Sequence, residues 1–404
     1  MAATAYRVCG LDVHKDSIFA CVKKGKYCST VREFCTDSEG LSELHHWLHG
    51  ELVTKVAMES TGIYWMPVWR ALEQDFDLLL VNPYFIKQMP GRKSDVADAK
   101  WIATLLDKEL LKGSLVPEKP IRVLRQYLRR YTIIQGRITR CLQEVEKQMS
   151  LCNIKIGSLS STLGSATVIS ILESLSQGKY DPNELIKHVH GRIINRHGHS
   201  KVIRSLEGII EENDLLLFRQ IFEDYQHYNK QCTELLNEAE KMATEIYSKE
   251  LKMLETIPGI KLLSAITIIA EIGGDISKFK SAEQLTGWAG LRPKNDESAG
   301  KIKSRSITKG NKYLRRILTQ TAWGATRTKN SFLKNKFEQL SIRRGNKKAL
   351  VSIARKQLVI IWNVLTKKES YIEPIIKLTE AQIKRKQKYY EDKLQSLTIL
   401  QTNG

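Results

Sequence analysis

The sequence is poor in the features that mark secreted, disulfide-linked and membrane proteins. It has seven cysteines among 404 residues, and no two of them are spaced as Cys-x-x-Cys. This argues against a disulfide framework and against a cysteine-based zinc site. No apolar run approaches the length of a membrane-spanning helix, and the first residues show no signal-peptide pattern. We therefore expect a soluble, cytoplasmic protein with no membrane partner.

Negative charge is also scarce. The chain has 64 Lys and Arg residues against 44 Asp and Glu residues, which gives a net charge of +20. So large an excess indicates a polyanionic partner, most simply nucleic acid. Yet the chain has no helix-turn-helix, zinc-finger or RNA-recognition-motif signature that would read bases. Charge alone binds nucleic acid without choosing a sequence.

The order of predicted elements in the first part of the chain indicates an α/β domain. We expect strands at 6–14, 16–24 and 28–36, after which helices and strands alternate. These are a helix at 41–50, a strand at 55–60, a helix at 64–76, a strand at 77–83 and a helix at 94–112. Three strands followed by this alternation are typical of a ribonuclease-H-like (RuvC-like) domain, which we place at residues 1–112.

Two carboxylates three residues apart stand out in the segment GRKSDVADAKWIA, at Asp95 and Asp98. They share a helix face and repel each other unless a cation joins them. The simpler alternative is a solvated first helical turn with Ser94 as its N-cap. Asp12 and Glu59 end the first and fourth predicted strands, at the same edge of the sheet. Four carboxylates meeting there would hold one or two Mg²⁺ ions, which can bind and orient a phosphate.

The middle of the chain, residues 113–253, is predicted to be helical. Apolar residues recur at spacings of three and four from Leu124 to Met149, and again from Phe218 to Ile246. The two stretches could pair within one chain as an antiparallel hairpin, or between chains as a coiled coil. A small helical insert, about residues 151–205, lies between them. The spacing of its histidines fits metal binding poorly; they are His188, His190, His197 and His199.

A mostly helical domain is expected at 254–366, followed by a basic helical tail at 367–404. A Pro258-Gly259 turn opens the domain, either as part of a helix-hairpin-helix that donates N–H groups to phosphate or as an ordinary helix junction. After Pro293 a small, polar loop carries Ser298, whose hydroxyl could attack a phosphodiester. The basic residues that would contact nucleic acid around it are Lys301, Lys303, Arg305, Lys309, Lys312, Arg315 and Arg316.

Two sets of motifs resemble, in order, those of the DEDD-type insertion-sequence transposases, a family of bridge-RNA-guided serine recombinases with a RuvC-like domain. They are GLDVHKD, AMESTGIYW, LVNP and KSDVADAKWIA, then IPGI, FKSAEQLTGWAGLRP, SAG and ITKGNKYLRR. The resemblance implies that the acids at 12, 59, 95 and 98 are catalytic and bind Mg²⁺, and that Ser298 is the nucleophile. This chain has Ala299 where the family usually has a glycine, and Ser304 and Ser306 are the alternative nucleophiles.

The same resemblance implies the partners of the chain. These are DNA at the element ends and at the target, a structured guide RNA, and further copies of the chain joined through the coiled coil. The protein would act in the bacterial cytoplasm, at the nucleoid. Two other functions remain compatible with the residues. One is a metal-dependent endonuclease that resolves junctions with water as the nucleophile, and the other is a non-catalytic nucleic-acid-binding scaffold.

Overall fold

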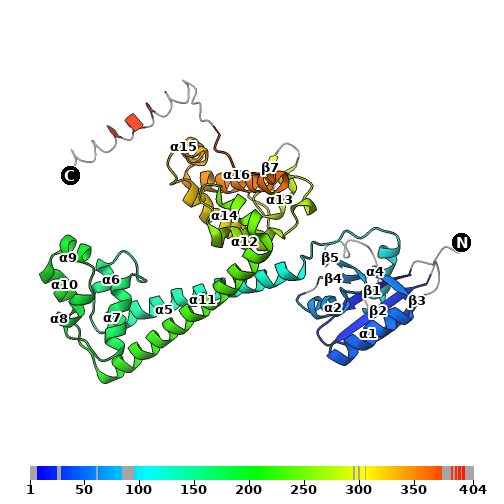
Figure 1. Ribbon diagram of the computed structural model, residues 1–404, viewed down its shortest axis with the longest axis horizontal. Coiled ribbons are helices and arrows are strands. Elements are labelled where there is room, and N and C mark those ends of the chain that lie inside the picture. The colour runs from blue at the N-terminus through cyan, green and yellow to red at the C-terminus, as the bar shows by residue number, and fades with distance from the viewer. Residues whose placement is uncertain are drawn as a thin grey trace. The chain divides into compact units, whose positions relative to one another are not determined.

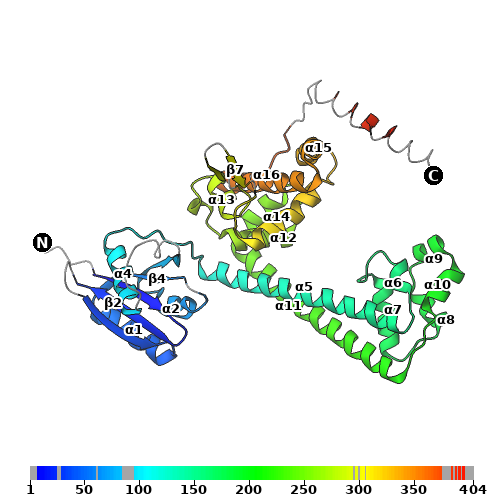
Figure 2. The same cartoon turned by 180° about the vertical axis from the view of Figure 1, so that it is seen from behind.

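The computed structural model describes residues 7–24, 29–60, 62–83, 95–293, 296–298, 301–304 and 306–374, with a few positions between 384 and 395. At 296–298 and 301–304 only the backbone is described. Most of the predicted basic tail lies outside these residues. The chain divides into two compact units, Met1–Val116 and Pro117–Gly404, which Figures 1 and 2 show from opposite sides. Each unit has hydrophobic clusters of its own.

The first unit is a five-stranded mixed sheet in the order β3-β2-β1-β4-β5. The first three strands pair antiparallel, and β4 and β5 join β1 in parallel. The strands are β1 (Arg7–Val13), β2 (Ser17–Lys23), β3 (Ser29–Cys35), β4 (Val53–Glu59) and β5 (Asp77–Val81). The predicted strands and helices are therefore present in the predicted order, and the fold is compatible with a ribonuclease-H-like domain.

Helices cover both faces of this sheet. Leu44 and Leu48 of α1 (Ser38–Gly50) and Val68 of α2 (Trp65–Leu72) share a buried cluster with Leu11 of β1. On the opposite face, α4 (Asp95–Asp107) packs on β1, β2 and β4. Neighbouring residues of a strand point to opposite faces. The inner strands β1 and β2 are buried along most of their length because helices cover both faces there, whereas the edge strand β3 is largely exposed.

The second unit is built on a helical hairpin within the chain. The helices α5 (Lys119–Leu151) and α11 (Glu212–Glu255) pack along each other. Ile138 and Cys232 lie in their shared core, where Gln135 Nε2 donates a hydrogen bond to Cys232 Sγ at 3.4 Å. The apolar rows of α5 and α11 thus pack against each other within one chain. This is the antiparallel hairpin, the first of the two predicted alternatives.

One residue of the second predicted row does not lie in the seam. Ile246 is 48% exposed, whereas the next residue, Tyr247, is buried. Ala239, Ala243, Tyr247 and Leu251 are buried, so the buried positions recur every four residues here. A heptad pattern alternates spacings of three and four, and it therefore places Ile246 where the helix buries Tyr247. Tyr247 also has non-helical dihedral angles (φ −122°, ψ 26°), which mark a kink in α11.

Five short helices form the insert at one end of the hairpin. They are α6 (Ile156–Leu159), α7 (Ala166–Ser176), α8 (Pro182–Leu185), α9 (Gly191–His197) and α10 (His199–Leu206), with a 3₁₀ turn at Ile186–His188. Their core includes Met149 of α5 and Phe218 of α11. His190 caps α9, because its Nδ1 accepts the N–H of Arg192 at 3.1 Å. This histidine therefore has a structural role.

The C-terminal helices form the other end of the second unit. They are α12 (Leu262–Ile272), α13 (Ala282–Trp288), α14 (Lys312–Ala325), α15 (Phe332–Arg344) and α16 (Asn346–Lys367), with a 3₁₀ turn at Ile276–Lys278 and a hairpin of β6 (Asp296–Ser298) and β7 (Lys301–Ser304). The turn at Pro258-Gly259 packs inside this group. Gln357 Nε2 donates to the Pro258 carbonyl at 2.8 Å, and a Cβ on Gly259 would lie 2.2 Å from the Thr321 carbonyl oxygen. The turn is thus a close-packed helix junction.

A buried carboxylate ties α5, α12 and α14 together. Glu271, which is 1% exposed, accepts two hydrogen bonds from Arg129 at 3.0 and 2.8 Å and one from Asn311 at 2.7 Å. Arg125 donates to the backbone carbonyls of Ala270 and Glu271. Burial lowers the pKa of Arg125 to about 10. Removing one member of such a network would leave the others buried and unpaired, which is strongly destabilising. The network therefore stabilises this arrangement of the three helices.

The helix α16 has the length and the apolar composition that would suffice to cross a membrane, with a mean hydropathy of 1.3. This differs from the expectation that no apolar run approaches that length. Its apolar residues are used in the protein core: Ile353, Leu358 and Ile361 are fully buried, and the helix packs on α13, α14 and α15. A core helix of a folded domain accounts for the composition.

Candidate functional site

The C-terminal ends of two neighbouring strands bring the first pair of predicted acids together. Leu11 of β1 pairs with Met58 of β4 in a parallel register, so Asp12 and Glu59 occupy the next position on each strand. Both also lie on the face that α4 covers, because side chains alternate along a strand. Ala57, two residues before Glu59, is buried in the cluster under α4.

The second pair stands at the start of α4, which lies very close to β1. A Cβ on Gly10 would be 2.3 Å from the backbone nitrogen of Ala103 and 2.5 Å from the carbonyl oxygen of Ala99. Only a residue without a side chain permits this approach of helix and strand backbones. It brings the first turn of α4, with Asp95 and Asp98, to the strand end that carries Asp12.

A histidine joins two of these acids. Nε2 of His14 lies 3.1 Å from Asp12 Oδ2 and 3.6 Å from Asp95 Oδ1, and the three side chains offer ligand atoms within 4.8 Å of one another. Burial raises the pKa of Asp12; His14 opposes this rise, and the negative charges of Asp98 and Glu59 add to it. Asp98 and Glu59 therefore lie close enough for their charges to act on Asp12, and His14 connects Asp12 to Asp95.

The donor set fits a hard divalent cation. Carboxylate oxygens are the ligands that Mg²⁺ prefers, and it is usually held by one or two of them together with water and substrate phosphate. A cation here would offset both the burial and the nearby negative charges that raise the pKa of Asp12. The residues present therefore fit a divalent metal ion.

His14 was not among the residues predicted from the sequence. The signal was present, because His14 follows Asp12 by two positions, and residues so spaced lie on the same side of an extended chain. A single exposed histidine after a strand is common, however, and its contact with Asp95 depends on the packing of α4. Only the fold brings the two together.

We expect Gly10→Ala to damage both the domain and its site. The added methyl group would push α4 from β1, which should lower the free energy of unfolding by about 1–3 kcal/mol and move Asp95 and Asp98 away from Asp12. Thermal unfolding would measure the first effect, and titration with Mg²⁺ would measure the second. Gly50→Ala is the matched control, since a Cβ at Gly50 meets nothing within 4 Å. Equal stability of the two variants would contradict this account of α4.

The predicted nucleophile lies in a β-hairpin of the second unit. Ser298 is the last residue of β6, and its backbone pairs with Lys301 at the start of β7. The base of the hairpin is closed by a bridge between Pro293 and Ile307. The side chains of Ser298, Lys301 and Lys303, and the whole of Arg305, lie outside the described residues. The backbone thus places Ser298 beside the two-residue connection of the hairpin.

Other predicted basic residues lie after this hairpin, at the start of α14. Lys309, Lys312 and Tyr313 line an open hollow together with Arg129 and Trp288. The Lys312 ammonium and the Arg129 guanidinium both lie over the Tyr313 ring, at 5.1 and 4.5 Å from its centroid. Arg315 and Arg316 follow on α14, half-buried and exposed respectively. Cations held at an aromatic ring are suited to binding phosphates and bases.

Comparison with known proteins matches two segments of the chain. A DEDD transposase domain model of the IS110 type matches residues 9–154, and the model "Transposase IS116/IS110/IS902 family" matches residues 251–338. The first segment includes the four acids, and the second includes Ser298 and the start of α14. Together the two segments make up more than half of the chain.

Two curated relatives agree with these matches. The transposase for insertion sequence element IS1111A of Coxiella burnetii is 34% identical over 153 residues, which are 34% of this chain and 41% of that protein. A protein of Sinorhizobium fredii assigned as the transposase y4pF/y4sB is 29% identical over 125 residues, which are 30% of this chain and 32% of that protein. Each match spans less than half of the relative. With both of its characteristic domains present in order, the chain belongs to the IS110/IS116 family of insertion-sequence transposases.

Proposed function

We propose that this protein is a recombinase that moves its own insertion sequence by cutting and rejoining DNA under the guidance of RNA. The observation that supports the proposal is that Asp12, Glu59, Asp95 and Asp98 lie at one edge of the sheet, in a chain whose second unit matches the same family. A net charge of +20 suits a protein that holds DNA and RNA together.

The acids would hold Mg²⁺, which when bound neutralises charge on a phosphate and polarises its oxygens. Asp12 and Glu59, fixed at the ends of two strands, give the site its rigid side. Asp95 and Asp98 come from a helix start that depends on the contact at Gly10. His14 holds Asp12 and Asp95 in place by the short contacts it makes to both. Rigid placement of this kind is what phosphoryl transfer demands of a protein.

The proposed nucleophile is Ser298. Its Oγ would attack the phosphorus of a DNA phosphodiester, give up its proton, and form a phosphoserine bond while the bond to one deoxyribose oxygen breaks and that oxygen takes up a proton. The basic residues around the hairpin would stabilise the negative charge on the phosphate. The reverse attack by a deoxyribose hydroxyl on the phosphoserine would rejoin strands in a new order. Exchange between two duplexes needs more than one nucleophile, so we propose that several copies of the chain act together.

Guidance by RNA accounts for site choice. A recombinase must select its sites from a large excess of other DNA, and charge cannot do this. Base pairing with a structured RNA can, while the protein holds the backbones, as in other RNA-guided systems.

We expect protein freed of RNA to bind DNA without sequence preference and to give no site-specific recombination. Adding back RNA transcribed from the flanking sequence of the element should restore recombination. Changing the pairing loops of that RNA should redirect the target. Binding of both nucleic acids should weaken steeply as salt is raised. Efficient, site-specific recombination by the RNA-free protein would exclude the guide.

The same preparation separates the proposal from its alternatives. A junction-resolving endonuclease would cut branched DNA in Mg²⁺ and leave no protein attached to the product. A scaffold would bind nucleic acid and cut nothing. A covalent protein–DNA adduct on a denaturing gel, formed only with guide RNA, is the result that the proposed mechanism requires.

A further inference from the structure

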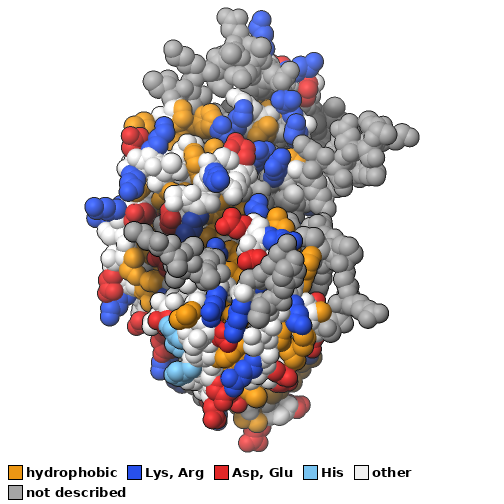
Figure 3. All heavy atoms as spheres, turned by 90° about the vertical axis from the view of Figure 1, so that its right-hand side faces the viewer, with side chains coloured by type: hydrophobic (Ala, Val, Ile, Leu, Met, Phe, Trp, Pro, Cys, Tyr) orange, Lys and Arg blue, Asp and Glu red, His pale blue; other side chains and the backbone are white. Residues whose placement is uncertain are grey.

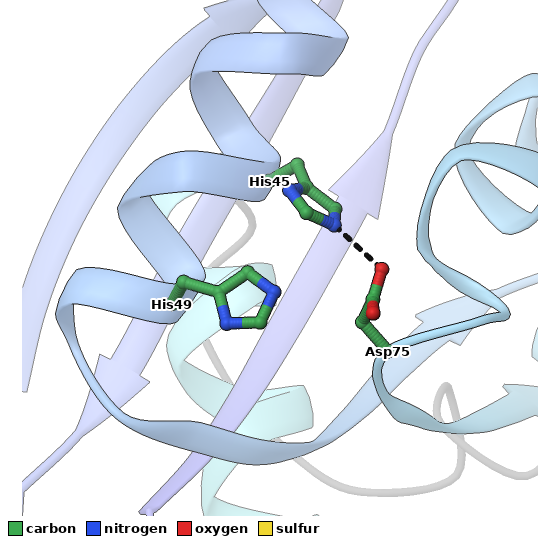
Figure 4. Close-up of side chains that lie close together, drawn as sticks. All are labelled: His45, His49 and Asp75. Carbon is green, nitrogen blue, oxygen red and sulfur yellow. Dashed lines mark hydrogen bonds and ion pairs between the residues drawn. The ribbon is translucent and has the colours of Figure 1, made fainter.

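A second cluster of ligand-type side chains lies in the first unit, on the other face of the sheet. His45 and His49 are one turn apart on α1, and Asp75 lies in the turn between α2 and β5. Figure 4 shows the three side chains close together, with the dashed line joining His45 to Asp75. His45 Nε2 donates a hydrogen bond to Asp75 Oδ2 at 2.9 Å, and one ligand atom from each residue lies within 4.8 Å of the other two.

Packing already holds the two rings. The His45 and His49 rings lie 4.7 Å apart between centroids, and both contact the ring of Phe76, at 5.5 and 4.9 Å. Phe76 is itself almost fully buried. The imidazoles therefore rest on a fixed apolar base, while Asp75 and His49 remain exposed. Histidine side chains are visible among charged ones on the face shown in Figure 3. A cation could reach His49 and Asp75 from solvent, because both are exposed.

We propose that His45, His49 and Asp75 form a binding site for Zn²⁺ or a similar late transition-metal ion, separate from the acid cluster on the α4 face. Two imidazole nitrogens and a carboxylate oxygen are a common zinc ligand set, with water in the fourth position. Histidines four residues apart on a helix can reach one metal ion. Ligand atoms at zinc distances in a tetrahedron are about 3.3 Å apart, and His45 Nε2 and Asp75 Oδ2 already approach that spacing.

Binding would replace the proton shared by His45 and Asp75 with the metal ion. That proton would leave to solvent, since metal ligands must be deprotonated. The ion would join α1 to the turn that leads into β5, and so cross-link two segments that contact the same face of the sheet. The acid cluster is chemically different, because its four predicted ligands are all carboxylates, which favour Mg²⁺ over a softer ion.

The site is tested by titrating the full-length, chelator-treated protein with Zn²⁺ in excess Mg²⁺, by calorimetry and by thermal unfolding. We expect wild-type protein to bind and to unfold at a higher temperature with Zn²⁺. His49→Gln and Asp75→Asn should each lose at least tenfold in Zn²⁺ affinity. Both variants should fold, because these two side chains are exposed. Co²⁺ in place of Zn²⁺ should give visible absorption bands of a tetrahedral site.

Two control variants make the result specific. His46→Ala removes a neighbouring α1 histidine whose Nδ1 donates to the Ser42 carbonyl at 2.8 Å, and Zn²⁺ affinity should not change. His14→Ala removes the histidine that contacts Asp12 and Asp95 in the acid cluster, and the Zn²⁺ affinity should again be unchanged. If His14→Ala abolishes binding while His49→Gln and Asp75→Asn retain it, the metal belongs to the acid cluster and the proposal is wrong. Absence of Zn²⁺ binding by the wild type would also overturn it.

Discussion

If the proposed recombination mechanism is correct, an Asp12→Asn variant will bind nucleic acid as the wild type does but will lose recombination by a factor of at least about 10²–10³, the size of effect seen when one group that stabilises a transition state is removed. Asp12 is central because it is 8% exposed, touches His14, and interacts with two other acids of the cluster. Its amide variant keeps the shape of the side chain and removes the charge. Recombination at the wild-type rate would show that these acids do not hold the catalytic metal.

The same variant should be more stable than the wild type when metal is removed. The folded-state pKa of Asp12 lies above its ordinary value, so the folded protein binds the proton more tightly than the unfolded chain does. The Asp12 carboxylate therefore contributes a loss of stability that grows as pH rises through the folded pKa. The Asp12→Asn change removes this cost, because an amide does not ionise. Thermal unfolding in chelator should show a higher midpoint for the variant near neutral pH, and Mg²⁺ should raise the midpoint of the wild type only.

A Ser298→Ala variant will form no covalent adduct with DNA. Where a serine is the nucleophile, its loss can cost on the order of 10⁶ in rate, so this change should have the larger effect on recombination. Folding and nucleic-acid binding should persist, because alanine removes only the hydroxyl. Denaturing gels with labelled element-end DNA, Mg²⁺ and guide RNA measure the adduct directly.

The matched controls for this variant are its neighbours in the same segment. Ser304→Ala and Ser306→Ala should retain the adduct, and the phosphoserine should map by mass spectrometry to position 298. If the adduct survives in Ser298→Ala and maps to one of the other two serines, the role moves to that residue. If no adduct forms with the wild type although DNA is cut, water is the nucleophile and the endonuclease alternative is correct.

Local sequence signals predicted the first unit well and the second less completely. Strand and helix order in residues 7–107 follows from alternation and turn residues, which act over short distances. Asp12 and Glu59 could be found because they end strands that a parallel sheet places side by side. The link from His14 to Asp95 depends on a close approach at Gly10, and no local pattern in the sequence specifies such an approach.

Long-range polar contacts were beyond the reach of sequence patterns. Arg129 and Glu271 are 142 positions apart, and each by itself resembles an ordinary charged helix residue. The heptad rows predicted the two helices but not which helix each would pack against. The same spacing is compatible with a hairpin in one chain and with a coiled coil between chains. The cluster of His45, His49 and Asp75 likewise needs the turn after α2 to lie beside α1.

The antiparallel pairing of α5 and α11 has a consequence for how this protein can vary in size. The chain leads to the insert along α5 and returns to the C-terminal helices along α11. The insert is therefore connected to the rest of the second unit only through these two helices in sequence. Removing residues from one helix alone would turn its apolar face away by about 100° per residue. Removing about two turns from both would shorten the pair by about 10 Å and keep every remaining contact in register. The distance between the insert and the C-terminal helices therefore depends on the lengths of both α5 and α11. It can change only if the two helices gain or lose the same number of residues.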